Sequence, residues 1–437
     1  MREAAPAIAV LPSGQPRRVG RGTSGEHMAR DRITWLIGLM TALLFINYVD
    51  RGNLATVGPL LTHDLRLSNT QFGLLLGAFY WTYAPAQLVL SWLCPRVDTF
   101  RLLAIGSLVW SLTTAATSLA AGFASLLAMR LLLGIGESVI YPASSTLFAQ
   151  LVPEERRGAA NGWMSVGLWI GPAIGTYAGS VIMDHFSWQA TFLIFGTLSL
   201  LWLGPWFRFG RGVAHASVAT VGRPPRYRDV LAKRAAWGAF IGHFSCNYSF
   251  YFVIGWLPKY LVDVRGLSLV QMGIVGGLVF YGITAAASVA GGVYADYAIR
   301  RGASVTLMRK LFLVIGQAGS GVCLILCGAL PSVAVPVLLA SALFFGISSG
   351  PVLGVGQTLA GPRAAGQWIG MQNFVGNLAG IVTLPVTGML VDRFGNYGWA
   401  FAVAGAVTFL GAAAWGWIIP KVEPIEWPGS RARTALP

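Results

Sequence analysis

The stretch "ITWLIGLMTALLFINYVDRGNLA" (residues 33–55) is long and apolar enough to cross a bilayer as a helix, yet it carries Asp50 and Arg51 side by side. Further apolar runs of about 20 residues recur along most of the remaining chain. The 437 residues are 55% hydrophobic and 11% charged, with a mean hydropathy of +0.63. Soluble domains average about 25% charged residues. The composition therefore excludes a soluble enzyme and predicts an all-α membrane protein.

The apolar runs predict twelve transmembrane helices in two halves of six. Similar loops follow the second and eighth predicted spans, "SWLCPRVDTFR" (91–101) and "GGVYADYAIRRG" (291–302). Repeated halves are typical of transporters that bind substrate near the midplane, between the halves. We predict a tail at 1–32, a first half at 33–207, a linker at 208–234, a second half at 235–420 and a tail at 421–437. The spans are expected at 33–61, 70–94, 99–120, 123–152, 158–184, 188–207, 235–262, 269–299, 308–329, 331–360, 365–393 and 396–420.

The basic residues predict the orientation in the membrane. With the N-terminus inside, 25 of the 31 Lys and Arg residues fall in cytoplasmic segments and four on the other side. By the positive-inside rule both termini are cytoplasmic, and we expect a multi-pass protein of a bacterial inner membrane. The net charge of +15 comes from these loops and not from a nucleic-acid-binding motif, so no nucleic acid partner is expected.

Two further charges interrupt an apolar run, Arg130 and Glu137 in "AMRLLLGIGESVIYP" (128–142). A charge at hydrocarbon depth is costly and commonly marks an ion or substrate path. A seven-residue separation places Arg130 and Glu137 on one helix face, and the predicted depth of Asp50 lies between theirs. We therefore expect these groups to share one cavity with Arg51. The alternative is that they are ion pairs that only stabilise the bundle.

The sum of these four charges suggests a mechanism. With Asp50 and Glu137 ionised the four groups are neutral, whereas protonation leaves Arg51 and Arg130 without compensating charge. An anion then becomes the favourable partner, so proton binding and anion binding would favour one another. For Arg130, pairing with Glu137 without any contact to substrate is the alternative.

These residues lie in motifs that resemble the major facilitator superfamily and, within it, the anion:cation symporter family of sugar-acid transporters. The resemblance implies proton coupling through Asp50 and Glu137 and substrate contacts from Arg51, Arg130, Tyr83 and Asn373. The motifs are "NYVDRGNLA" (47–55), "RLLLGIGESVIYPASS" (130–145), "WLPKYL" (256–261) and "GMQNFVGNLAGIVTLPVTGMLVDRFG" (370–395).

The chain departs from the family pattern at two places. Leu168 stands where galactonate-type members have a glutamine that contacts substrate, which puts galactonate in doubt as the substrate. The loop after the second span has Pro95 in place of the usual aspartate, but its second copy keeps Gly292, Asp296 and Arg300. We expect these three residues to form a conformational latch and not a substrate site.

Weaker candidates lie in the second half. Asn247, Tyr248 and Tyr251 in the seventh span carry amide or phenol groups suited to sugar hydroxyls, although membrane aromatics more often pack or lie at the interface. Gln357 is polar at helix depth and is a further substrate candidate. His243 is a possible proton carrier, with a packed histidine as the more ordinary interpretation.

The sequence "GLWIGPAIG" (167–175) leaves an alternative function open. It resembles the glycine-proline pattern of antiporters in the superfamily, although close packing of helices through small residues also explains it. We predict a proton-coupled symporter that imports an organic anion, with a sugar acid as the expected substrate. The alternatives are a proton-driven exporter of amphipathic compounds and a transporter-like receptor. No metal or cofactor other than the coupling protons is expected, and the protein is expected to act as a monomer.

Overall fold

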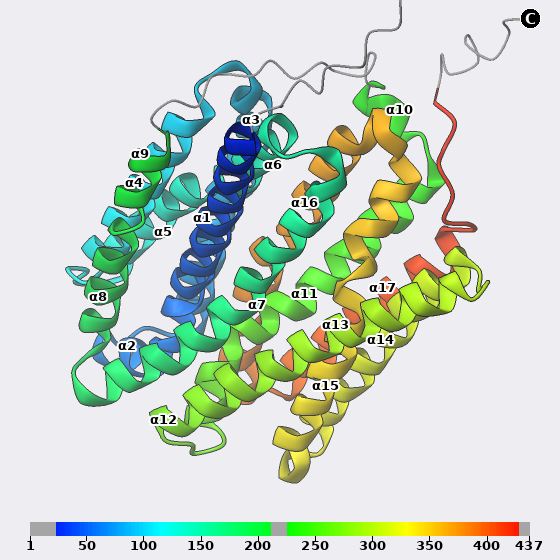
Figure 1. Cartoon of the computed structure of the whole chain (residues 1–437). Helices are drawn as coiled ribbons and strands as arrows, with labels where there is room; N and C mark the ends of the chain where they lie inside the picture. The colour runs from blue at the N-terminus through cyan, green and yellow to red at the C-terminus, as the bar shows by residue number, and fades with distance from the viewer. Residues whose placement is uncertain (1–22, 211–224, 428–437) are drawn as a thin grey trace, which may run out of the picture.

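The computed structural model describes residues 23–210 and 225–427, apart from a few side chains within helices, among them that of Asp296. These residues form helices and connecting turns, and none of them lies in a β-strand (Figure 1). The segment 23–210 contains α1 (Thr23–Thr56), α2 (Gly58–Asp64), α3 (Asn69–Leu93), η1 (Cys94–Arg96), α4 (Thr99–Thr117), α5 (Phe123–Glu137), α6 (Ile140–Leu151), α7 (Glu154–His185), α8 (Trp188–Leu200) and α9 (Leu203–Gly210). The segment 225–427 contains α10 (Tyr227–Leu231), α11 (Arg234–Asp263), α12 (Leu269–Met272), η2 (Gly273–Val279), α13 (Phe280–Arg300), α14 (Val305–Ala329), η3 (Pro331–Val333), α15 (Ala334–Ser349), α16 (Pro351–Phe394), α17 (Gly398–Ala413) and η4 (Ala414–Ile418).

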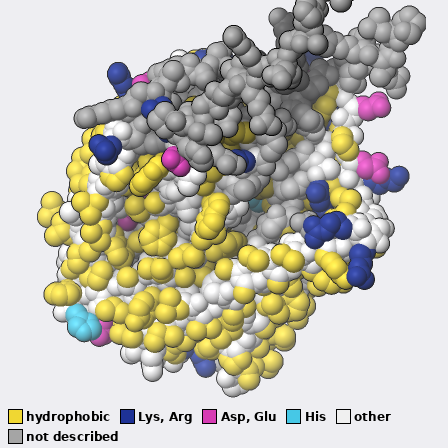
Figure 2. All heavy atoms as spheres, in the orientation of Figure 1, with side chains coloured by type: hydrophobic (Ala, Val, Ile, Leu, Met, Phe, Trp, Pro, Cys, Tyr) yellow, Lys and Arg dark blue, Asp and Glu magenta, His cyan; other side chains and the backbone are white. Residues whose placement is uncertain are grey.

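Ten helical segments of the described chain are long and apolar enough to cross a membrane. The predicted spans 70–94 and 235–262 correspond to α3 and α11, two long helices with more polar and aromatic residues. Most residues of α11 are buried, so its polar side chains face protein. Hydrophobic side chains cover the sides of the bundle, and most charges lie toward its ends (Figure 2). Each of the twelve predicted spans thus contains helix, while the boundaries of the two halves, the linker and the tails stay predictions.

Gly361 divides the longest helix in two. Its φ of 63° and ψ of 175° are not helical, so α16 consists of two helical segments that meet at this residue. Glycine is the residue that adopts such a backbone without strain from a Cβ atom. The break falls between the predicted spans 331–360 and 365–393, and the connection between them is shorter than expected.

Glycines on α7 allow α1 to approach very closely. A Cβ atom at Gly167 would lie 2.7 Å from the Thr41 carbonyl oxygen, and one at Gly171 would lie 2.7 Å from the Phe45 carbonyl oxygen. These glycines are one helical turn apart and form one packing face. The close-packing explanation of "GLWIGPAIG" is therefore confirmed, and the pattern needs no antiporter to account for it.

The two parts of the chain meet where α3 begins and α16 ends, at the end of the molecule that also carries α2 and α12, hereafter the α2 end (Figure 1). Gly73 on α3 packs directly on the Leu384 carbonyl of α16. Asp392 accepts hydrogen bonds from the Asn69 amide (3.2 Å) and side chain (2.9 Å), and from the Thr70 amide (2.7 Å) and hydroxyl (2.6 Å). A carboxylate at a helix N-terminus is favoured by the helix dipole. Asp392 therefore joins the two parts at this end.

We predict that Gly171→Ala destabilises the protein, because its methyl group would enter the contact with Phe45 and Tyr48. Overpacking costs about 1–3 kcal/mol, so the melting temperature in detergent should fall. Gly162→Ala is the matched control, since a Cβ there meets nothing within 4 Å on the same helix. Equal melting temperatures for the two variants would contradict the close packing of α1 on α7.

We also predict that Asp392→Asn weakens closure at the α2 end. The substitution removes the charge that faces the α3 N-terminus, worth about 1 kcal/mol, so separated conformations should become more populated. Spin labels on His63→Cys and Val264→Cys would report this as longer distances between α2 and the end of α11. Asp184→Asn is the control, because Asp184 is an exposed acid at the end of α7 that pairs with its neighbour His185. Identical distance distributions for the two variants would argue against the role of Asp392.

Candidate functional site

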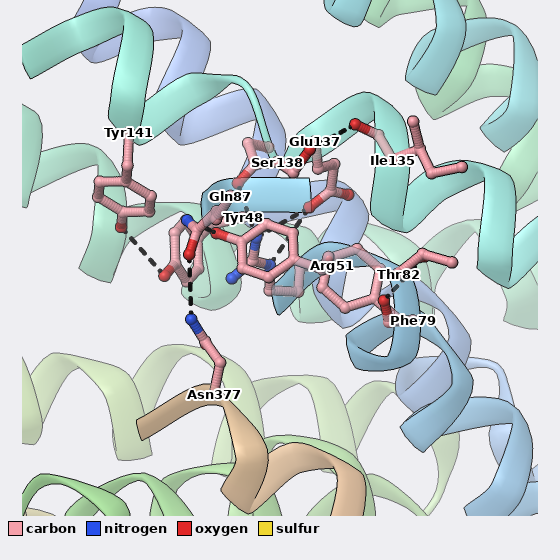
Figure 3. A network of polar contacts seen from close by, with 12 residues as sticks. Tyr48, Arg51, Phe79, Thr82, Gln87, Ile135, Glu137, Ser138, Tyr141 and Asn377 are labelled. Atoms are coloured by element: carbon pink, nitrogen blue, oxygen red, sulfur yellow. Dashed lines mark hydrogen bonds and ion pairs between the residues drawn. The ribbon is translucent and has the colours of Figure 1, made fainter. Parts of the chain in front are cut away.

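A buried ion pair joins α1 to α5 in the interior of the bundle. Arg51 Nη2 donates to Glu137 Oε2 at 3.0 Å, and Arg51 Nε donates to the same oxygen at 3.3 Å (Figure 3). Arg51 is 7% exposed and Glu137 is fully buried. Breaking such a pair would leave an uncompensated buried charge, so both residues hold one another in place. The sequence left open a pair between Glu137 and Arg130, but the partner of Glu137 is Arg51.

Three aromatic rings surround the Arg51 guanidinium. Its central carbon lies 4.7 Å from the ring centre of Tyr83, 4.8 Å from that of Tyr48 and 5.0 Å from that of Phe79. Ring faces attract cations electrostatically, and more strongly when both are desolvated. The predicted site residue Tyr83 therefore lies directly beside Arg51, and the rings keep this cation in a defined position.

Arg130 contacts the same aromatic group through Phe79. Its guanidinium carbon lies 5.2 Å from the ring centre of Phe79, and its Nε donates to the Leu75 carbonyl oxygen at 3.3 Å. The residue is 5% exposed, and no carboxylate of the described residues forms an ion pair with it. Two buried arginines thus lie near one aromatic ring, and the one carboxylate paired with them, that of Glu137, balances only one of their two positive charges. This arrangement favours an additional anion.

Asp50 makes its hydrogen bonds outside this group, and the single shared cavity expected from the sequence stays a prediction. Its carboxylate accepts hydrogen bonds from Asn53 Nδ2 at 3.2 Å and from Ser199 Oγ at 3.0 Å. It is 1% exposed, and no arginine or lysine within the described ranges forms an ion pair with it. Successive helix residues are about 100° apart, which explains why Asp50 faces α8 while Arg51 faces α5.

A chain of hydrogen bonds connects Tyr83 to the second part of the molecule. Gln87 Nε2 donates to the Tyr83 hydroxyl at 3.0 Å. Asn377 Nδ2 donates to Gln87 Oε1 at 3.2 Å, a contact that Figure 3 shows. The Tyr251 hydroxyl in turn donates to Asn377 Oδ1 at 2.7 Å. These groups come from α3, α16 and α11. They lie beside Arg51, hereafter the caged arginine because three aromatic rings surround it. Their amide and hydroxyl groups are of the kind that hydrogen-bond the hydroxyls of a polyol.

The other predicted substrate residues surround this network less directly. Asn373 is half-buried one turn before Asn377 and forms no side-chain hydrogen bond to the described residues. Asn247 is half-buried, and its amide faces the α16 backbone at Gly376. The side chain of Gln357 is exposed, in the segment of α16 before the break. Their roles as substrate contacts stay predictions.

His243 and Tyr248 pack in the interior of α11. The His243 ring lies against Gly376 and is 7% exposed, and its Nδ1 has no partner among the described residues. Tyr248 is 3% exposed. Neither side chain belongs to the hydrogen-bonded network that contains Tyr251.

The predicted latch lies on α13, away from the caged arginine. Gly292 is exposed with open space around its Cα, and Arg300 is exposed at the end of the helix. The side chain of Asp296 lies outside the described residues. The latch therefore stays a prediction.

Sequence reasoning missed Gln87, Asn377 and Ser199 as members of the site. One signal was present: Gln87 and Asn377 follow the predicted residues Tyr83 and Asn373 by four positions, which places them on the same helix faces. Ser199 offered no comparable signal, because its hydroxyl lies in an ordinary apolar run. The described residues contain no cluster of His, Cys, Asp or Glu able to hold a metal ion.

Comparisons with known proteins identify the family. A model of the Major Facilitator Superfamily matches residues 40–383. The chain is 30% identical over 417 residues to the hexuronate transporter of Bacillus subtilis, covering 91% of this chain and 96% of that one. It is 29% identical over 424 residues to the probable sulfoacetate transporter SauU of Cupriavidus necator, covering 92% of this chain and 98% of that one.

A solved structure shares the fold. It is a bacterial homolog of the human lysosomal transporter Spinster in an inward-facing and unoccupied conformation, with a TM-score of 0.72 and 18% sequence identity. The match covers 88% of this chain and 98% of that chain. The predicted superfamily is confirmed, and the relatives are membrane transporters and not enzymes. With its helical fold, its apolar spans and a family match over residues 40–383, this chain belongs to the major facilitator superfamily.

Proposed function

We propose that the protein is a proton-coupled symporter that imports an organic anion, with a sugar acid as the expected substrate. The observation that carries the proposal is the pair of buried arginines, Arg51 and Arg130, on one aromatic group with a single carboxylate partner. Arginine binds carboxylates through two parallel hydrogen bonds, which suits an acid substrate. Two organic-anion transporters among the relatives support the same substrate class.

The ion pair between Arg51 and Glu137 supplies the coupling in this proposal. While Glu137 is ionised it competes with the substrate for Arg51. A proton on Glu137 removes that competition, so the substrate carboxylate takes its place beside Arg51 and Arg130. Release of the proton on the cytoplasmic side restores the ion pair and expels the anion, after which the empty carrier returns.

The amide and hydroxyl groups beside Arg51 favour a hydroxylated acid. Gln87, Asn377 and Tyr251 already satisfy one another, so a sugar acid exchanges these hydrogen bonds for its own hydroxyls. Because the network includes residues of α3, α16 and α11, a substrate bound there contacts both parts of the molecule. Alternating access requires such a shared site, since both parts must respond to its occupancy.

Uptake by purified protein in proteoliposomes tests the proposed function. We expect an inward proton gradient to drive accumulation of at least one acid from a panel of hexuronates, aldonates, glucarate and sulfonated acids. In Arg130→Gln the site loses a buried cation, which costs about 2 kcal/mol or more, so apparent affinity should fall at least roughly tenfold. Arg393→Gln, at an exposed position, is the matched control. Expulsion of amphipathic compounds under the same gradient, without uptake of any acid, would instead support an exporter.

Glu137→Gln separates substrate binding from proton coupling. Glutamine keeps the shape of the side chain but cannot release a proton, so exchange of internal for external substrate should persist while proton-driven accumulation is lost. Both activities are measured in the same vesicles with labelled substrate. Glu423→Gln, at an exposed residue, should leave both unchanged. Normal accumulation by Glu137→Gln would exclude this residue as the coupling site.

A further inference from the structure

Asp50 lies among polar side chains, hereafter the polar compartment, on a face of α1 about 100° from the one that carries Arg51. Its two hydrogen-bond donors are Asn53 on α1 and Ser199 on α8. The charged groups closest to it are Arg51, which follows it in the chain, and Glu137, and these two pair with each other. Of the neighbouring helices, α8 brings the Ser199 hydroxyl to Asp50 and α4 brings the Trp110 indole.

One face of α4 presents an unusual row of polar atoms. The hydroxyls of Ser107, Ser111 and Thr114 and the indole Nε1 of Trp110 have no hydrogen-bond partner among the described residues. All four residues are at most 2% exposed. Their spacing of three and four positions puts them on one helix face. The Trp110 indole lies near the Asp50 carboxylate without meeting hydrogen-bond geometry.

The neighbouring hydroxyls of α4 behave differently. Thr113 Oγ1 donates to the Val109 carbonyl at 2.7 Å, and Thr117 Oγ1 donates to the Thr113 carbonyl at 2.8 Å. This is the usual way for a buried helical hydroxyl to satisfy itself. The same option was open to Ser111 and Thr114, whose hydroxyls instead lie away from their own backbone. Within α4, the unpartnered atoms therefore lie on the face that carries Trp110, the residue of this helix whose indole is near Asp50.

Two neighbouring helices also carry unpartnered polar atoms. They are Asn53 Oδ1 on α1 and Thr191 Oγ1 on α8, both in residues at most 1% exposed. The α4 and α8 backbones touch where Gly196 meets the Ser111 carbonyl, with 2.8 Å to a Cβ built at Gly196. Buried polar atoms without protein partners are commonly satisfied by internal water, each molecule making about three hydrogen bonds. The compartment therefore suits a small cluster of water.

We propose that α1, α4 and α8 enclose a water-filled proton route to Asp50, separate from the substrate path through Arg51. The route runs toward the α2 end, because Thr114 lies three residues before the end of α4 and Thr191 three residues after the start of α8. In this arrangement Ser111 and Thr114 are positioning residues that hold the water. The inference rests on the proposed proton coupling and assigns Asp50 its own access, apart from Glu137.

The test replaces hydroxyls while keeping side-chain shape. In Ser111→Ala with Thr114→Val, we expect the rate of proton-driven uptake to fall about tenfold, with substrate exchange unchanged, because exchange needs no proton transfer to Asp50. The single substitution Thr114→Ser, with Ser111 unchanged, should give a nearly normal rate of proton-driven uptake, since serine keeps the hydroxyl. Thr113→Val is the control, because its hydroxyl already bonds its own helix. Unfolding is monitored by the melting temperature of each variant.

Asp50→Asn distinguishes failure of the inference from failure of the proposed function. If Asp50→Asn abolishes accumulation while the double hydroxyl variant keeps a normal uptake rate, the water route is wrong and proton coupling stands. If Asp50→Asn leaves accumulation unchanged, coupling does not pass through Asp50, and the proposed proton route is overturned. Loss of exchange together with accumulation in the double variant would assign Ser111 and Thr114 to packing, and would also overturn the route.

Discussion

The low dielectric of a membrane protein interior requires every buried charge to have a partner, and the arrangement around α1 follows from that requirement. Arg51 and Glu137 satisfy it with a direct ion pair at 3.0 Å, reinforced by the faces of Tyr48, Phe79 and Tyr83. Arg130 satisfies it only partly, through a carbonyl and one ring. Because Arg51 has a carboxylate partner and the nearby Arg130 has none among the described residues, the site carries excess positive charge. It therefore prefers an anion, which a fully paired group would not.

The contact between the two parts of the molecule has a different physical basis. Near the α2 end the helix backbones approach through glycine, as at Gly73 and Gly388, and are joined by the capping of α3 by Asp392. Closer to the caged arginine the contact is made by the side-chain amides of Gln87 and Asn377. Backbone packing is hard to rearrange gradually, whereas amide hydrogen bonds exchange readily with those of a bound molecule. The first type of contact suits a gate and the second suits a recognition site.

The sequence was sufficient to predict the helical spans and the charged residues at membrane depth. Length and apolarity predict a helix in each of the twelve spans, but not α10 in the predicted linker or the start of α1 in the predicted tail. The cost of charge singles out Asp50, Arg51, Arg130 and Glu137. Which charges meet was not predictable, because helix rotation decides it. Glu137 pairs with Arg51, whereas its pair with Arg130 was the alternative to substrate binding by Arg130, and Asp50 lies about 100° around α1 from Arg51.

The neutral residues of the site were the hardest to foresee. Asn373 and Asn377 both fit the motif, and only the packing of α16 on α3 and α11 distinguishes them. Gln87 and Ser199 carry no charge, so the cost of burial does not reveal them. Residues of this kind become part of a site through tertiary contacts that no local pattern encodes.

The adjacency of Asp50 and Arg51 in the chain has a mechanical consequence. One peptide unit connects a carboxylate held by α8 to a guanidinium held by α5. When a ligand draws Arg51 away from Glu137, the resulting torque on α1 acts on Asp50 with almost no intervening structure to absorb it. A rotation of α1 at Arg51 therefore also moves Asp50, so that a change of partner for the guanidinium changes the geometry around the carboxylate.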